Sequence, residues 1–257
     1  LMRLFSVIQW HHFAYMIISL ALLGYGASGT FLAFARHRLL RHFPTAFFLN
    51  LALFGVSSVA CYFLAQKIPF NPQEVLWDAR QPLMLFGIYL LLALPFFFVA
   101  NSIGLALTGY RKETSKIYAA DLIGAGGGAL GIILLLFWVF PMKALLILGV
   151  LGLLAAVASL WELGWRRKGW ALAMAAMALL PLLLPGHWPQ PNLSPYKALS
   201  QTLRVSGTQI VEERSSPLGW VAVVESSRVP FRHAPGLSLN ARTVPPRQKG
   251  LFTDGGS

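Results

Sequence analysis

The stretch that decides the fold is Phe13 to Ala35, which reads FAYMIISLALLGYGASGTFLAFA and contains no charged residue. A helix rises 1.5 Å per residue, so this stretch covers about 35 Å and exceeds the roughly 30 Å hydrocarbon core of a bilayer. A surface helix of a soluble protein carries charged residues on its outer face. The sequence therefore predicts a membrane-spanning helix over residues 13–35.

The composition of the whole chain agrees with this prediction. Of the 257 residues, 56% are hydrophobic and only 12% are charged, with a mean hydropathy of +0.61. Soluble domains carry roughly a quarter charged residues. We therefore expect a mainly α-helical, polytopic transmembrane bundle over residues 1–186, followed by a small extramembrane tail with β-structure over residues 187–257.

Five further apolar stretches follow the first, which predicts about six spans. The third span of the six is long enough to tilt or kink, and Pro95 lies near its middle. A tight break at Pro141, Met142 and Lys143 makes the fourth and fifth a predicted helical hairpin. We expect the spans over residues 13–35, 43–66, 83–109, 117–140, 144–161 and 170–185.

Basic residues are unevenly divided between the two sides of this predicted bundle. Lysine and arginine are retained in cytoplasmic loops, so the richer side is predicted to be cytoplasmic and the chain start, the loop at 67–82 and the tail to be outside. In a bacterial inner membrane, outside means periplasmic. The richer side holds Arg36, Arg38, Arg41, Arg111, Lys112, Lys116, Arg166, Arg167 and Lys168; the poorer side holds Arg3, Lys67, Arg80 and Lys143.

The tail contains two short runs with strand character. Gln209–Glu213 and Trp220–Glu225 are separated by a turn-rich segment that includes Ser216 and Gly219. This pattern predicts a β-hairpin.

Several function classes are disfavoured by the sequence. The formal charge of +12 suits anionic lipid better than nucleic acid, because the basic residues lie between apolar spans and not in a run interleaved with aromatics. Cys61 is the single cysteine, and the histidines show no metal-ligand spacing. No nucleophile motif is present. We expect no metal, no cofactor and no catalytic residue.

Two groups of glycines lie within predicted spans. A glycine-rich phosphate loop must follow a strand and open a helix, whereas these glycines lie inside apolar stretches. Small residues four apart allow two membrane helices to approach closely. We therefore predict helix packing at Gly24, Gly26 and Gly29 in the first span, and at Gly124, Gly127, Gly128 and Gly131 in the fourth.

Three polar side chains fall at membrane depth. Ionisable groups there are functional candidates, yet Asp121 also lies within a turn of the predicted cytoplasmic end, where it can pair with Lys116 or Arg111 and complement the helix dipole. Asn50 and Asn101 are predicted to form hydrogen bonds between helices.

Six strings in order resemble the membrane-bound, spermidine-synthase-like proteins of bacteria, whose membrane region precedes an aminopropyltransferase-type domain. The resemblance covers most of the chain, and its most specific part is Tyr118, Asp121 and Gly124. The resemblance implies that cofactor and catalytic motifs follow the position of Asp254 and Gly255, so it assigns no catalytic residue here. The strings are ISLALLGYGASGTF (18–31), LPFFFVANSIGLAL (94–107), IYAADLIGAGGGALG (117–131), SPYKALSQTL (194–203), APGLSL (234–239) and LFTDG (251–255).

These observations favour a non-catalytic integral membrane subunit or scaffold, related to those proteins and packed against other membrane subunits or a second copy of itself in the lipid bilayer. Two alternatives stay open. One is the N-terminal part of a membrane-anchored aminopropyltransferase. The other is a transporter of a small solute, which would use Asp121, Asn101 and the glycine faces.

Overall fold

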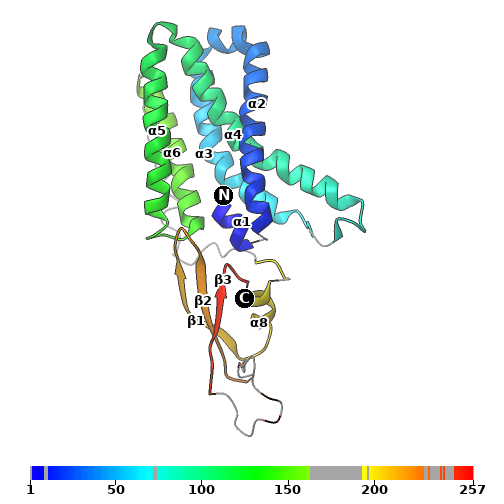
Figure 1. Cartoon of the computed structure of the whole chain (residues 1–257). Helices are drawn as coiled ribbons and strands as arrows, with labels where there is room; N and C mark the ends of the chain where they lie inside the picture. The colour runs from blue at the N-terminus through cyan, green and yellow to red at the C-terminus, as the bar shows by residue number, and fades with distance from the viewer. Residues whose placement is uncertain are drawn as a thin grey trace. The chain divides into compact units, whose positions relative to one another are not determined.

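The structure is a computed structural model of the 257-residue chain, and it is mainly helical with one small sheet (Figure 1). Contacts divide the chain into two compact units. We call Tyr15–Ile132 with Met142–Pro189 the helical unit, and Leu1–Ala14 with Ile133–Pro141 and Gln190–Ser257 the mixed unit. The structure describes residues 2–8, 11–71, 74–162, 193–195, 197–228, 231, 238, 240 and 246–256.

Five described helices are long and apolar enough to cross a membrane, which confirms the coarse fold class of a helical protein with apolar spans and a small sheet. The predicted span at 170–185 lies outside the described residues. A short 3₁₀ turn, η2 (Arg111–Glu113), joins two of the helices. The five are α2 (His11–Arg41), α3 (Phe43–Lys67), α4 (Arg80–Gly109), α5 (Thr114–Leu135) and α6 (Pro141–Glu162).

One helix extends past its predicted span, and one predicted break is wrong. Helix α2 continues to Arg41, beyond the span predicted over 13–35, because no helix breaker intervenes and basic residues in a last turn complement the helix dipole. The break predicted at Pro141–Lys143 lies earlier, at residues 136–140, and α6 begins at Pro141. Proline suits the first position of a helix, where its missing N–H has no partner to lose.

Helix α4 changes direction along its length in Figure 1. Its 30 residues correspond to about 45 Å of straight helix, longer than a bilayer core. Pro95 is buried within it, and proline removes one backbone hydrogen bond and bends the axis. We attribute the bend to this residue, as the sequence predicted.

The mixed unit contains two short helices, α1 (Met2–Ile8) and α8 (Ala198–Leu203), and a three-stranded antiparallel sheet. Strands β1 (Thr208–Ser215) and β2 (Trp220–Ser226) form the predicted hairpin, which is therefore confirmed. Its loop closes with a hydrogen bond from the Ser216 N–H to the Gly219 carbonyl, 2.9 Å. Strand β3 (Gly250–Thr253) pairs with β2 and was not predicted.

One apolar cluster holds the mixed unit together. Alternate residues of β2 are buried, as expected of a strand with one covered face. Segments distant in sequence contribute to the same cluster, since Phe140 from the turn between α5 and α6 packs against it. The buried members are Leu199, Trp220, Ala222, Val224 and Phe252.

Candidate functional site

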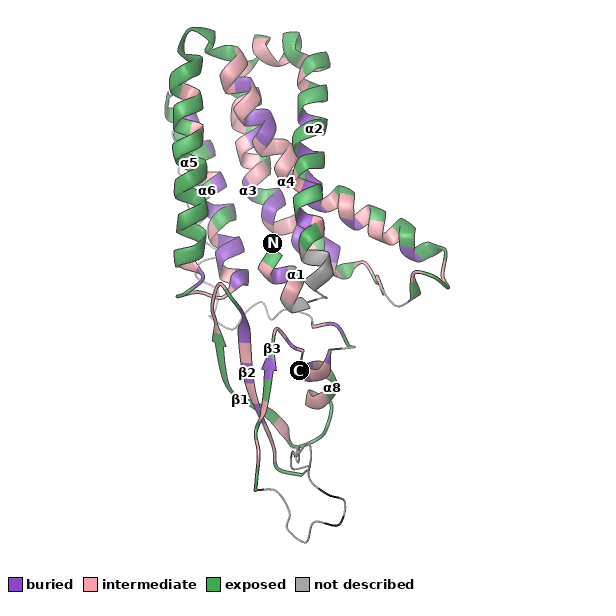
Figure 2. Ribbon diagram, in the orientation of Figure 1, coloured by how far each residue is buried: buried purple, intermediate pink, exposed green. Residues whose placement is uncertain are grey.

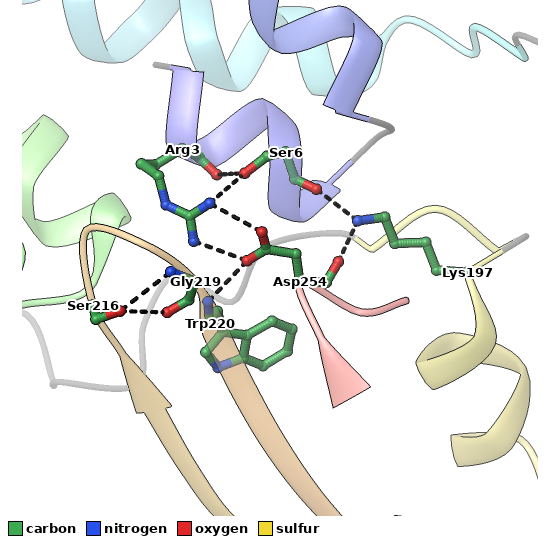
Figure 3. A network of polar contacts seen from close by, with 7 residues as sticks. All are labelled: Arg3, Ser6, Lys197, Ser216, Gly219, Trp220 and Asp254. Atoms are coloured by element: carbon green, nitrogen blue, oxygen red, sulfur yellow. Dashed lines mark hydrogen bonds and ion pairs between the residues drawn. The ribbon is translucent and has the colours of Figure 1, made fainter. Parts of the chain in front are cut away.

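The turn after β3 positions the polar centre of the mixed unit. Asp254 and Gly255 both have positive φ, 51° and 72°, which is the geometry of a type I′ turn and the reason that Asp-Gly favours it. Thr253 and Gly256 close the turn with two backbone hydrogen bonds of 3.0 and 2.9 Å. The turn presents the Asp254 carboxylate to α1 and β2 (Figure 3).

The Asp254 carboxylate accepts three N–H groups. Arg3 Nη2 and the Trp220 backbone N–H both reach Oδ1 at 2.8 Å, and Arg3 Nη1 reaches Oδ2 at 3.0 Å. Burial opposes ionisation of this carboxyl, but the hydrogen bonds from Arg3 and Trp220 and the charges of Arg3 and Lys197 outweigh it. They hold the Asp254 pKa below its ordinary 3.8.

Lys197 lies beside this pair and is only 5% exposed. Its ammonium group donates to the Ser6 carbonyl at 2.7 Å and to the Asp254 carbonyl. Burial lowers the Lys197 pKa from 10.5 to about 8; Asp254 opposes this shift and Arg3 adds to it. Figure 3 shows how Lys197 bridges α1 and the turn.

The polar groups of Arg3, Lys197 and Asp254 are engaged in hydrogen bonds within this network. The Asp254 oxygens already accept charged and backbone donors, and the Lys197 amine already donates to two carbonyls, so neither group is placed to transfer a proton to a substrate. Ser6 fixes Arg3 from the other side, accepting from Nη1 at 2.8 Å. Among the described residues, no group of three or more His, Cys, Asp or Glu side chains could hold a metal ion. The network is a structural clamp between α1 and the sheet.

In the helical unit, one predicted packing glycine lies directly on another helix. A Cβ on Gly24 of α2 would stand 2.6 Å from Phe96 Cβ, 2.8 Å from the Ala93 oxygen and 2.9 Å from the Phe97 nitrogen of α4. A side chain at Gly24 would force α2 and α4 to shift, because two of the three neighbours are backbone atoms. Gly26 and Gly29 have no described atom within 4 Å of this position.

A second close glycine contact joins α3 and α6, and the sequence did not predict it. A Cβ on Gly55 would be 2.8 Å from the Gly149 oxygen, and one on Gly152 would be 2.8 Å from Gly55 Cα. Gly149 and Gly152 lie three apart and share a helix face, which was the available signal. Gly55 is isolated among larger residues, so the sequence around it carries no small-residue pattern that would indicate the contact.

Helix α5 differs from the other long helices. It has no buried residue, and Figure 2 shows it exposed along its length, while α3, α4 and α6 carry buried residues. No described atom lies within 4 Å of a Cβ placed on Gly124, Gly127, Gly128 or Gly131. A packing role for these four glycines stays a prediction.

The three polar candidates lie on three different helices. Asn50 of α3 is buried but donates to the Ala46 carbonyl of its own helix at 2.7 Å. Asn101 of α4 is 1% exposed, and its Oδ1 has no hydrogen-bond partner among the described residues. Asp121 of α5 is partly exposed. The described ion pair of Lys116 is with Glu113, at 4.0 Å, and not with Asp121.

The fold therefore defines a helical protein with five apolar helices of membrane-spanning length and a small clamped sheet. No protein-family model matches the sequence, and comparisons with curated proteins and with solved structures found no match. The resemblance to spermidine-synthase-like membrane proteins stays a prediction from the residues that carry it.

Proposed function

We propose that the chain is a non-catalytic integral membrane subunit that packs against another membrane protein through α5. The supporting observation is the contrast between α5 and the other four apolar helices. Those four bury residues within the chain, whereas α5 buries none of its 22.

The physical basis is how helices associate in lipid. Burial of apolar surface gives little driving force in lipid, so helix association depends on close van der Waals contact. Small residues allow two helix backbones to approach closely enough for that contact. The contact of Gly55 with Gly149 and Gly152 shows this chemistry inside the chain. Helix α5 offers the same kind of surface at Gly124 and Gly128 with no described neighbour, which suits a helix from another subunit.

The proposed location is a bacterial inner membrane. Basic residues at the end of α2 and after α4 support a cytoplasmic position for the turns there, by the retention of lysine and arginine on that side. The mixed unit then lies in the periplasm. The proposed partners are the lipid bilayer and either a different membrane subunit or a second copy of this chain.

The test is purification from native membranes in a mild detergent, followed by mass spectrometry of co-purifying proteins and native electrophoresis for self-association. The wild type is expected to retain a partner or a second copy, and Gly124→Leu with Gly128→Leu is expected to lose it. Gly26→Leu with Gly29→Leu is the matched control, because no described atom obstructs these α2 glycines either. Recovery of the wild type always as a lone monomer contradicts the proposal.

A second candidate is the N-terminal part of a membrane-anchored aminopropyltransferase. It is favoured by where two of the resembling strings lie: SPYKALSQTL contains α8, and LFTDG contains the end of β3 and its turn. Both contribute to one packed unit through Leu199 and Phe252. Reading the downstream DNA in frame tests this candidate, and a glycine-rich motif followed by an acidic loop would favour it over the scaffold.

A further inference from the structure

Two turns far apart in sequence meet at one end of the helical unit. The Phe43 ring, where α3 begins, lies edge-on to the Tyr110 ring that follows α4, with centroids 5.4 Å apart at 86°. A Cβ on Gly109 would be 2.8 Å from Phe43 Cε2. The turn between α2 and α3 therefore adjoins the turn between α4 and α5, and both lie at the upper end in Figure 1.

This meeting concentrates positive charge. We call the six basic residues in these two turns and in the adjoining ends of α2 and α5 the cationic rim; all six are exposed. The nearest carboxylate in sequence is Glu113, which forms a 4.0 Å, largely exposed pair with Lys116 and so neutralises little at a distance. The cationic rim consists of Arg36, Arg38, Arg41, Arg111, Lys112 and Lys116.

Aromatic and apolar surface accompanies the cationic rim. Phe34 is 88% exposed and Tyr110 is 45% exposed, and aromatic side chains of membrane proteins gather at the headgroup level. The exposed apolar residues of α2 and α5 continue from there along the helices. This order of basic residues, aromatic rings and apolar helix surface matches a phospholipid, in which a charged phosphate is attached to acyl chains.

We propose that the cationic rim binds the headgroups of anionic phospholipids, with Arg41, Arg111 and Lys112 at its centre beside the Phe43–Tyr110 contact. A nucleic acid or acidic protein would satisfy the charges and leave the adjoining apolar helices uncovered, whereas a lipid satisfies both. Each lysine or arginine near an anionic surface contributes about 1 kcal/mol, or roughly fivefold in affinity.

The experiment is native mass spectrometry of the full chain in detergent with phosphatidylglycerol or phosphatidylcholine added. The wild type is expected to bind phosphatidylglycerol in preference. The variant Arg41→Gln, Arg111→Gln and Lys112→Gln is expected to bind it at least tenfold more weakly, with phosphatidylcholine binding unchanged. Lysine at both arginine positions keeps the charge and is expected to keep most of the affinity.

The matched control removes three exposed basic residues of the mixed unit: Arg214→Gln, Arg228→Gln and Lys249→Gln. It is expected to bind phosphatidylglycerol like the wild type. Equal weakening in both triple variants, or no preference in the wild type, overturns the proposal. Competition by millimolar inorganic phosphate also overturns it, because the surface then recognises a soluble anion. Helical circular dichroism verifies that each variant is folded.

Discussion

Arg3 and Asp254, 251 positions apart in the sequence, form a two-pronged ion pair with N–O distances of 2.8 and 3.0 Å. The pair joins α1, the first described helix, to the turn after the last strand. Both side chains are about a quarter exposed or less, so solvent only partly screens the interaction. A planar guanidinium matches a carboxylate in this geometry better than an ammonium group would.

Arg3→Gln is expected to loosen α1 from the sheet and to destabilise the mixed unit by about 1–3 kcal/mol, since Asp254 keeps its charge and loses its charged partner. Hydrogen–deuterium exchange of peptides within 2–8 and 197–228 measures the effect. Arg228→Gln, at an exposed position with one hydrogen bond to Ser206, is the control. Unchanged exchange in both segments would show that the pair is not what holds α1.

The stability of the mixed unit is expected to depend on pH through Lys197. Its pKa is about 8 in the folded protein and 10.5 ordinarily, so between these values the unfolded chain binds more protons and stability rises with pH. A neutral amine keeps two N–H donors for the two carbonyls. Exchange protection of 197–228 in the wild type should therefore increase relative to Lys197→Met from about pH 8 to pH 10.5; parallel profiles would contradict it. Lys249→Met is the exposed control.

Gly24→Ala is expected to destabilise the helical unit by about 1–3 kcal/mol, because the new methyl group meets the backbone of α4 beside buried Pro95. Gly26→Ala, two residues along the same helix, meets nothing within 4 Å in the described structure. It should be neutral or stabilising by up to about 1 kcal/mol, from alanine's better helix propensity. Thermal unfolding in detergent compares the two, and equal midpoints would argue against the α2–α4 contact.

Gly55→Ala tests the contact between α3 and α6. The methyl group would stand 2.8 Å from the Gly149 oxygen and the Leu153 nitrogen, so the helices must separate, at a cost of about 1–3 kcal/mol. Gly87→Ala in α4, where the new methyl group meets no described atom within 4 Å, is the comparison. If the midpoint of thermal unfolding falls in Gly87→Ala as much as in Gly55→Ala, the cause is not this contact.

The long helices and the hairpin could be predicted because each follows from local pattern. Uncharged runs of more than 20 residues and alternating strand residues act over short distances along the chain. The start of α6 could not be placed from the sequence because two tendencies compete at Pro141: proline interrupts a helix, and it also begins helices. Strand β3 has only four residues and is defined by its pairing with β2, which no local pattern records.

The polar network of Arg3, Lys197 and Asp254 could not be predicted from the sequence, because it too depends on contacts between distant segments. Arg3, Lys197 and Asp254 come from three separate segments, and nothing near any of them in the chain marks the other two as partners. The small-residue pattern correctly predicted packing at Gly24 but did not indicate Gly55, whose close contact depends on Gly149 and Gly152 of α6. The glycines of α5 carry the same small-residue pattern as Gly24 but have no described neighbour, so the pattern alone does not say which helix face packs against another helix.

Helix α1 and the sheet belong to one folded unit, and this limits how often the chain can cross a membrane between them. Segments that fold together occupy one aqueous compartment. If the apolar helices cross a bilayer, the chain must therefore cross it an even number of times between one segment of this unit and the next. Four described helices separate Arg3 from Phe140, which packs in the same cluster. Reporters fused before Arg3 and beyond Asp254 should accordingly give the same sidedness.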